Sequence, residues 1–240
     1  MNRMRCGVAC GLLCSVWLTP ACGSDGAMAG APAVSLPATC RAEVATSPLL
    51  LVDDFEDANL LLASDTNLHG LWYIHNDGTG MQVPAAGDPH GAANLIDGPG
   101  SELSPAHALH TRGRGFSGWG AFVAARLNAG DKQICTVDLS TYSVLALSLR
   151  GSGRIRFNLG TLATTPVADG GACREDACSD YGTSVELSED WQDITVALAS
   201  LSQPDWATPT GFEPASSLRL SFWAESADFD IWLDDIRLRE

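Results

Sequence analysis

Apolar and polar residues alternate in short segments along the chain from residue 49 onward, and turn-forming residues separate these segments. The alternation is strictest in RIRFNLG at 154–160, LRLSFWA at 218–224 and FDIWLDD at 229–235. A period of two indicates strands that bury one face. We therefore predict strands over 49–52, 71–76, 102–111, 120–127, 142–150, 154–160, 181–187, 192–198, 218–224 and 229–238.

The number and spacing of these segments predict the fold class. About ten short strands, with no long helical period and no internal repeat, are typical of an all-β protein, a β-sandwich or jelly roll of two antiparallel sheets. The 24 Gly and 12 Pro residues suit short strands joined by turns and argue against a mostly helical chain. We place this domain at 49–240.

The charge balance restricts the partners. The chain has 29 acidic and 14 basic residues and a formal net charge of −15 at pH 7. Nucleic acids and anionic membrane surfaces are bound through basic patches. The composition therefore argues against either of them as the main partner.

The first 21 residues have the features of an export signal. They contain no acid, and Arg3 and Arg5 precede an apolar stretch from Cys6 to Leu18. That stretch is too short for a membrane span, which needs about 20 apolar residues. We predict a signal peptide at 1–21.

The sequence LTPAC at 18–22 resembles the lipobox of bacterial lipoproteins, in which the cysteine is lipidated and becomes the new N-terminus. The resemblance implies lipidation of Cys22 and, because Gly23 follows, an outer-membrane or cell-surface lipoprotein that contacts the membrane only through its lipid. A freely secreted protein, cleaved at Ala27-Met28-Ala29, is the alternative. Residues 23–39 are mostly Gly, Ala, Pro and Ser and cannot bury enough surface to offset their ordering entropy. We expect 22–48 to be the lipidated cysteine and a flexible linker.

Four cysteines remain beyond the leader and Cys22, namely Cys40, Cys135, Cys173 and Cys178. An even number in an exported chain predicts disulfides, and four cysteines allow three connectivities. The last two lie in the Gly- and Asp-rich loop ADGGACREDACSD and can close on each other, which leaves Cys40 with Cys135. A metal site is the alternative, but the spacing is wrong for a zinc ribbon and no histidine lies nearby.

Catalytic motifs give little support to an enzyme. GRGFSG at 113–118 fits G-x-G-x-x-G, but a strand follows it, whereas a dinucleotide site needs a helix there. The chain contains neither G-x-S-x-G nor H-E-x-x-H. His107 and His110 are three residues apart, so on a strand they point to opposite faces. We predict no catalytic residues.

Five segments together resemble a known family: LLVDDFED, SGWGAFV, VDLSTYSVLALSLRGSGRIRFNL, SEDWQDITVALASL and LRLSFWAESADFDIWLDDIRL. Their order and spacing over 49–239 resemble a carbohydrate-binding module of the family 11 type, a galactose-binding-like β-jelly roll, as found in exported bacterial lipoproteins. The complex I intermediate-associated protein family shares the opening and closing signatures. The resemblance implies a non-catalytic domain that binds β-glucan-type polysaccharides in a groove on one sheet face, through aromatic rings and polar side chains.

Trp223 is the centre of the binding site that we expect. Leu218, Leu220 and Phe222 take the core face of its strand, so Trp223 falls on the polar face, and a large exposed aromatic there suggests a ligand. Its position also matches a groove aromatic of family 11-like modules. Trp232 shares the parity argument but ranks lower, and Trp191 is expected in the core. The other candidates are Arg156 as a hydroxyl donor, Trp119 as a wall, and Trp72, Tyr73, His75 and Asp77 as the groove's edge.

The resemblance also implies a structural calcium ion where the two ends of the domain meet. The opening DDFE and the closing DDI would lie on neighbouring strands, with Asp54, Glu56 and Asp235 as oxygen ligands. Calcium takes six to eight hard oxygen ligands, which such a cluster with backbone carbonyls could supply. The alternative is that these acids cap strands and stay solvated.

Two other classes of function remain open from the sequence. The same sandwich could serve a structural or protein-interaction lipoprotein without a sugar ligand. A glycan-active enzyme would need a pair of catalytic carboxylates that the sequence does not place.

Overall fold

The computed structural model describes residues 38–43, 47–86, 95–130, 133–174 and 177–240. The predicted signal peptide, Cys22 and the alternative cleavage site lie outside the described residues. Within these ranges the chain forms strands joined by turns, with short 3-10 turns at Ser64–Thr66, Val167–Asp169, Leu198–Ser200 and Pro214–Ser216. The described part of the chain has no helix long and apolar enough to cross a membrane.

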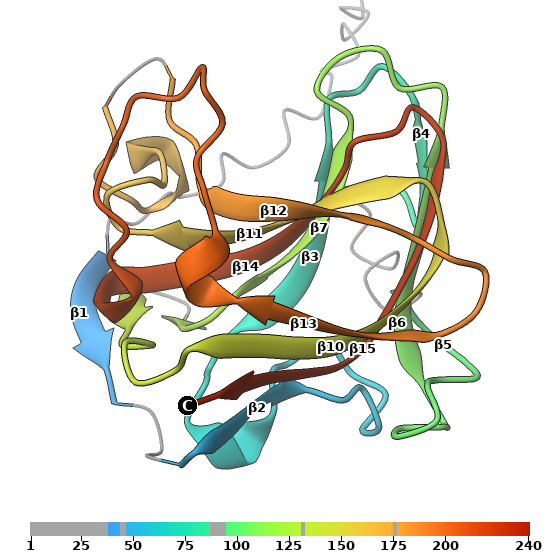
Figure 1. Ribbon diagram of the computed structural model, residues 1–240, viewed down its shortest axis with the longest axis horizontal. Coiled ribbons are helices and arrows are strands. Elements are labelled where there is room, and N and C mark those ends of the chain that lie inside the picture. Colours follow the sequence, from blue (N-terminus) through green and yellow to red (C-terminus); the bar gives the residue numbers. More distant parts are fainter. Residues whose placement is uncertain (1–37, 44–46, 87–94, 131–132, 175–176) are drawn as a thin grey trace, which may run out of the picture. The chain divides into compact units, whose positions relative to one another are not determined.

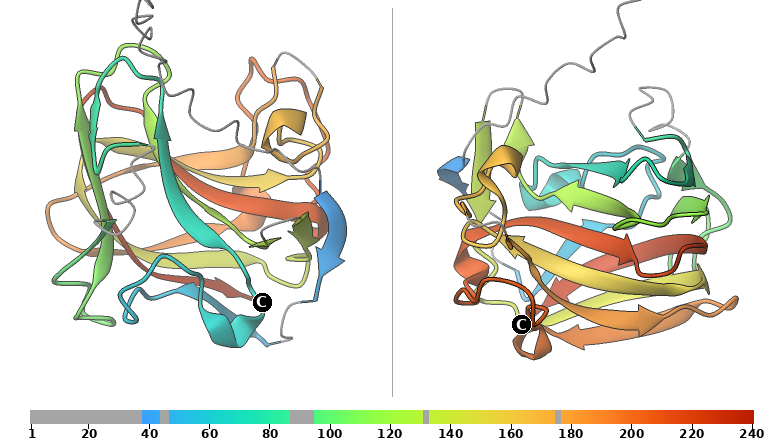
Figure 2. Two further views of the ribbon diagram at one scale, coloured as in Figure 1. Left: turned by 180° about the vertical axis from the view of Figure 1, so that it is seen from behind. Right: turned by 90° about the horizontal axis from the view of Figure 1, so that it is seen from above.

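The strands form two sheets, which Figures 1 and 2 show from three sides. The first sheet has the order β1 (Ala38–Ala42), β9 (Gln133–Val137), β14 (Ser217–Ala224), β11 (Arg154–Thr161) and β12 (Tyr181–Glu186), with β7 (Ala121–Arg126) beside β14, β3 (Leu71–Asn76) beside β7, and β8 (Ala129–Gly130) beside β9. The second sheet has the order β13 (Gln192–Ala197), β10 (Val144–Ser152), β15 (Phe229–Arg239), β6 (Ala108–Arg114) and β4 (Met81–Val83), with β2 (Leu49–Asp53) beside β15 and β5 (Ile96–Asp97) beside β6.

The core lies between the sheets and follows the period of two. On β11, Ile155, Phe157 and Leu159 are buried in it, and Leu220 and Phe222 of β14 join the same cluster. Apart from β1 and β9, which run parallel, the paired strands named above are antiparallel. The predicted all-β sandwich of jelly-roll type is confirmed.

The sequence prediction omits β4, β5, β8 and β9, and it differs from the structure most at two further places. Residues 102–107, predicted to be strand, form a loop before β6, and this loop is fixed by hydrogen bonds from the Ser101 and Ser104 hydroxyls to Asp235. At the other end, β1 lies within the segment 22–48 that the sequence suggests is linker, so the folded domain includes Ala38–Ala42. A segment of low hydrophobicity is ordered here by its pairing with β9 and by a disulfide, which composition alone does not predict.

Both predicted disulfides are confirmed. Cys40 of β1 is bonded to Cys135 of β9, its register partner, and Cys173 is bonded to Cys178 within the connection between β11 and β12. The first bond fixes an edge strand to the sheet. The second closes a short loop within a connection that also carries Asp169 and Asp180, the acids described below.

Candidate functional site

One row of side chains crosses five strands on the outer face of the first sheet. His75 of β3 is the register partner of Phe122 on β7, which pairs with Trp223 on β14, then Arg156 on β11 and Ser184 on β12. Partners in an antiparallel pair place their side chains on the same face. The opposite face belongs to the core, so this row faces outward.

Aromatic rings gather at one end of this row. The ring of Trp223 stacks on that of Phe122, with centroids 4.9 Å apart and planes inclined by 22°. The ring centroid of Trp119 lies 5.2 Å from that of Trp223 and 5.6 Å from that of His75, and 45% of the surface of Trp119 is exposed. We call Trp223, Trp119, Phe122 and His75 the aromatic cluster. Part of the apolar ring surface of this cluster is exposed to solvent.

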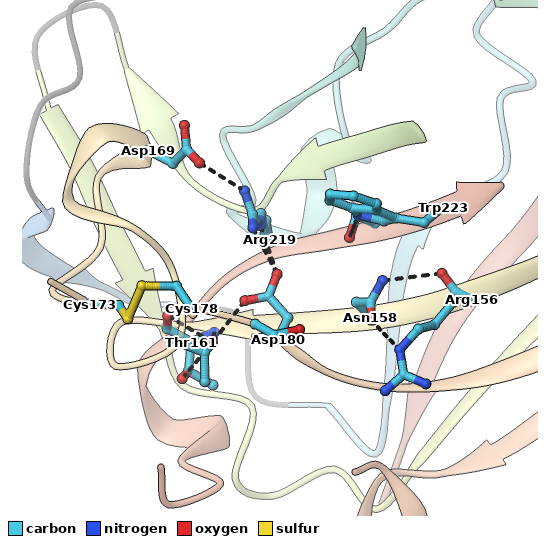
Figure 3. Close-up of polar contacts among 12 residues, drawn as sticks. Arg156, Asn158, Thr161, Asp169, Cys173, Cys178, Asp180, Arg219 and Trp223 are labelled. Atoms are coloured by element: carbon cyan, nitrogen blue, oxygen red, sulfur yellow. Dashed lines mark hydrogen bonds and ion pairs between the residues drawn. A yellow bond between two sulfur atoms is a disulfide. The ribbon is translucent and has the colours of Figure 1, made fainter. Parts of the chain in front are cut away.

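Short side chains form the next row, two residues further along each strand. Ala124, Ser221 and Asn158 are buried although they face outward, and Ser221 and Asn158 are hydrogen-bonded to the longer side chains of Trp223 and Arg156. The Trp223 Nε1–H donates to Ser221 Oγ (3.1 Å), so the indole extends along its own strand, as Figure 3 shows.

Arg156, like Trp223, forms a hydrogen bond with the residue two positions along its own strand. Its Nε–H donates to Asn158 Oδ1 (3.1 Å), and its Nη2 donates to the carbonyl oxygens of Gly182 (3.1 Å) and Ser202. A Cβ at Gly182 would lie 2.3 Å from Asn158 Oδ1, so a side chain there would disturb this arrangement. The guanidinium is therefore fixed towards β12, on the same sheet face as the aromatic cluster.

The loop that carries Trp119 is anchored by Asp77 and Thr79. Asp77 accepts hydrogen bonds from the Gly120 amide (2.6 Å) and from the amide and hydroxyl of Thr79, whose oxygen accepts from the Ser117 amide (2.9 Å). Desolvation acts to raise the pKa of Asp77, but these hydrogen bonds outweigh it and the pKa lies below its ordinary value. Asp77 therefore positions Trp119 by engaging the loop backbone.

Replacing Asp77 by asparagine is expected to destabilise the domain near neutral pH, because the amide nitrogen cannot accept the hydrogen bond from Gly120. The folded-state pKa lies below the ordinary 3.8, so the carboxylate stabilises the domain above that value, and this stabilisation is lost as the pH falls through the folded pKa. Thermal unfolding of wild type and Asp77→Asn should thus differ near neutral pH, and the difference should shrink as the pH falls through the folded-state pKa of Asp77. A difference that does not change with pH would contradict this role.

A buried ion pair lies further along β14 from Trp223 (Figure 3). The Arg219 guanidinium donates to Asp180 Oδ2 through Nε (3.0 Å) and Nη2 (2.9 Å), and Asp169 lies 3.6 Å from its Nη1. Burial acts to lower the pKa of Arg219, but the charge of Asp180 outweighs it and the pKa is raised. Asp180 also accepts from the Thr164 hydroxyl (2.8 Å), so both of its oxygens are engaged. This arginine is neutralised within the fold.

Trp232 occupies a similar outward position on the second sheet but offers no free ring face. His110 stacks on it at 3.8 Å, and the Arg150 guanidinium lies 4.1 Å from its centroid. The same guanidinium lies 5.0 Å from the ring of Trp191, which is half-buried here and not in the core as the sequence suggested. Both faces of Trp232 are covered by its neighbours, which supports its lower rank as a ligand-stacking residue.

The placement of Trp72 at the groove's edge is wrong. Its ring is fully buried between Phe55 and Phe222, and its Nε1–H donates to Asp53 (2.8 Å). Trp72 and Tyr73 are consecutive in β3, so they face opposite sides of the sheet. The parity that places Tyr73 and His75 outside necessarily places Trp72 inside.

The other predicted residues lie together. Trp223, Trp119, His75, Tyr73 and Arg156 share the outer face of the first sheet, with Asp77 beneath the Trp119 loop. Phe122, which underlies the cluster, was not predicted from the sequence.

The three predicted calcium ligands have protein partners. Asp54 accepts from the amide of Glu56 (3.4 Å). Glu56 accepts from the amides of Ala106 (3.0 Å) and His107 (3.2 Å). Asp235 accepts from the hydroxyls of Ser101 and Ser104 and from the guanidinium of Arg237. Among the described residues, no group of three or more His, Cys, Asp or Glu side chains is arranged to hold a metal ion.

The carboxylate of Asp235 forms an ion pair with Arg237. Calcium stays a prediction from the sequence. If a bound calcium ion stabilises the domain, EDTA will lower its melting temperature and added calcium will restore it. An unchanged melting temperature, together with metal analysis that finds no calcium, would contradict the prediction.

The sequence matches no protein-family model, and no curated protein matches it. Solved structures share the fold. The family 11 carbohydrate-binding module of the cellulosomal cellulase Lic26A-Cel5E of Clostridium thermocellum is 12% identical, with a TM-score of 0.51 over 81% of this chain and 96% of that one. A family 30 carbohydrate-binding module is 16% identical, with a TM-score of 0.51 over 80% of this chain and 99% of that one. The chain therefore has the jelly-roll fold that these modules share.

Proposed function

We propose that this protein is a non-catalytic carbohydrate-binding lipoprotein whose ligand lies on the outer face of the first sheet. The observation that carries the proposal is the partly exposed aromatic cluster, which shares one sheet face with a fixed arginine. The shared fold with carbohydrate-binding modules supports it.

The chemistry of a sugar fits both parts of this face. The C–H faces of pyranose rings are apolar and stack on the indoles of Trp223 and Trp119, while their hydroxyl groups need donors and acceptors. Arg156 supplies donors from a fixed position, and Tyr73, half-buried at the β3 edge, supplies a phenolic hydroxyl. A β-linked glucan is the ligand that we propose to examine first, in line with the resemblance in the sequence.

The second part of the proposal is a lipid anchor at Cys22. Lipidation of Cys22 would hold the protein at the outer membrane or cell surface, and the linker rich in Gly, Ala, Pro and Ser that follows would separate the domain from the lipid. Such a protein would retain polysaccharide at the surface without cleaving it. Radiolabelled fatty acid incorporated by wild type and not by Cys22→Ala would support the anchor, and export without incorporation would support the secreted alternative.

The binding proposal is tested by retardation of the domain in native gels that contain soluble polysaccharides, with mixed-linkage β-glucan first and a neutral α-glucan for comparison. Retardation by the β-glucan without release of reducing ends is expected. Release of reducing ends would show an enzyme instead. Mobility unchanged by every polysaccharide would contradict carbohydrate binding and favour the protein-interaction alternative.

Trp223→Ala is expected to weaken this binding by about 1–3 kcal/mol, or about 5- to 150-fold, because the stacked ring surface is lost. Trp232→Ala is the matched control, since it removes the same side chain from the outer face of the other sheet. Calorimetry measures both affinities, and thermal unfolding checks the fold. Unaltered affinity in a folded Trp223→Ala protein would remove this residue from the site.

A further inference from the structure

Arg156 retains donor capacity after its contacts within the fold. Its Nε and Nη2 groups donate to Asn158, Gly182 and Ser202, as described above, and all three acceptors are uncharged. Within the ranges that the structure describes, its Nη1 group makes no hydrogen bond. A guanidinium carries five N–H groups in a rigid plane, so Nη1 leaves two of them for a ligand.

The positive charge of Arg156 also has no carboxylate as an ion-pair partner among the described residues. Burial lowers the pKa of its guanidinium, and Glu225 opposes this shift. Glu225 is already paired with Arg154 at 2.9 Å. Arg156 itself forms no ion pair with any described residue, in contrast to Arg219. A half-buried positive charge is therefore fixed on one face of a strongly acidic protein.

A second arginine on the same face, Arg126, also forms no ion pair with a described residue. Arg126 of β7 is the register partner of Arg219, and its guanidinium lies over the ring of Tyr73, 6.0 Å from the centroid. No described carboxylate forms an ion pair with it. Two arginines without acidic partners therefore share the outer face with the aromatic cluster.

We propose that the ligand of this face is an acidic glycan, a β-linked polysaccharide that carries uronic acid residues. The inference rests on the proposed function and names the class of sugar. Trp223 stacks on a sugar ring, and Arg156, its register partner on β11, receives a carboxylate through Nη1. The Ser184 hydroxyl, the next partner in the row, is a second donor for the same group. Charge-assisted hydrogen bonds of this kind are about twice as strong as neutral ones.

The test compares two hexasaccharides with the same β-1,4 linkage and backbone. Hexameric oligoglucuronate has a carboxylate where cellohexaose has a hydroxymethyl group, so the two ligands differ only at that carbon. Calorimetry at low salt should give an affinity about tenfold higher for the oligoglucuronate, and high salt should reduce the preference.

Arg156→Gln should lower the ratio of the two affinities towards one, and Arg156→Lys, which keeps the charge, should restore part of the preference. Arg112→Gln is the matched control, because it removes an exposed arginine from β6 of the other sheet and should leave the ratio unchanged. Thermal unfolding of each variant establishes that it is folded.

Each outcome bears on the inference separately from the proposed function. Equal or tighter binding of cellohexaose by the wild type would overturn the acidic preference and leave glycan binding intact. An undiminished preference in Arg156→Gln would overturn the assignment of the carboxylate to this arginine. Failure to bind either hexasaccharide would overturn the inference, and failure with every polysaccharide in the gels would overturn the proposed function as well.

Discussion

Replacing Cys40 and Cys135 together by serine is expected to lower the free energy of unfolding by about 4 kcal/mol. This disulfide joins residues 95 apart in sequence, so it removes a large part of the chain's freedom in the unfolded state. The Cys173–Cys178 bond spans only five positions, and the corresponding double substitution is expected to cost about 2 kcal/mol. Urea unfolding of the oxidised protein and both variants measures the two losses.

The second variant is also the control for the first, since both remove one disulfide and add two hydroxyl groups. Equal losses, or a larger loss from the short loop, would contradict the account based on chain entropy. Peptide mapping without reduction should recover the same two pairs. Free thiols, or Cys40 joined to Cys173, would show that the pairing in solution is different.

Asp180→Ala is expected to lower the free energy of unfolding by about 3–5 kcal/mol, because it leaves the buried guanidinium of Arg219 without its main partner. The side chain of Asp180 is 4% exposed and that of Arg219 13%, so water compensates little of the loss. Asp169 lies at 3.6 Å and is far more exposed, so it cannot replace the two hydrogen bonds. Chemical unfolding near neutral pH measures the effect.

The double variant Asp180→Ala with Arg219→Met should be more stable than Asp180→Ala alone, because it removes the stranded charge and keeps an apolar stem of similar length. A loss below about 1 kcal/mol in the single variant would mean that the pair behaves as a surface ion pair. A double variant no more stable than the single one would mean that the loss comes from other contacts of Asp180, such as that with Thr164.

Strand parity in the sequence was sufficient to place Trp223 on the outer face of its strand. Leu220 and Phe222 point into the core, and Trp223 therefore points outward, as the structure shows. The same rule applied to β3 would have placed Trp72 in the core. Grouping Trp72 with Tyr73 and His75 treated a strand as a loop edge, and consecutive residues of a strand cannot share a face.

The rest of the site depends on contacts between distant parts of the chain, which local patterns do not contain. Trp119 joins the aromatic cluster because Asp77 and Thr79, about 40 positions earlier, hydrogen-bond its loop. Arg219 is neutralised by Asp180, which comes from the connection between β11 and β12. The sequence shows these charged residues but not which of them pair, and so it could not separate Arg219 from Arg156.

The edge position of β1 has a mechanical consequence for an anchored protein. If the proposed lipid anchor holds the chain at the cell and bound polysaccharide is pulled away, tension along the chain reaches the domain at β1. The hydrogen bonds between β1 and its parallel neighbour β9 could then be separated one after another. The bond between Cys40 and Cys135 lies within the first residues of that pairing. Load is therefore transferred covalently to β9, the next strand of the sheet, before the remainder of β1 can peel away.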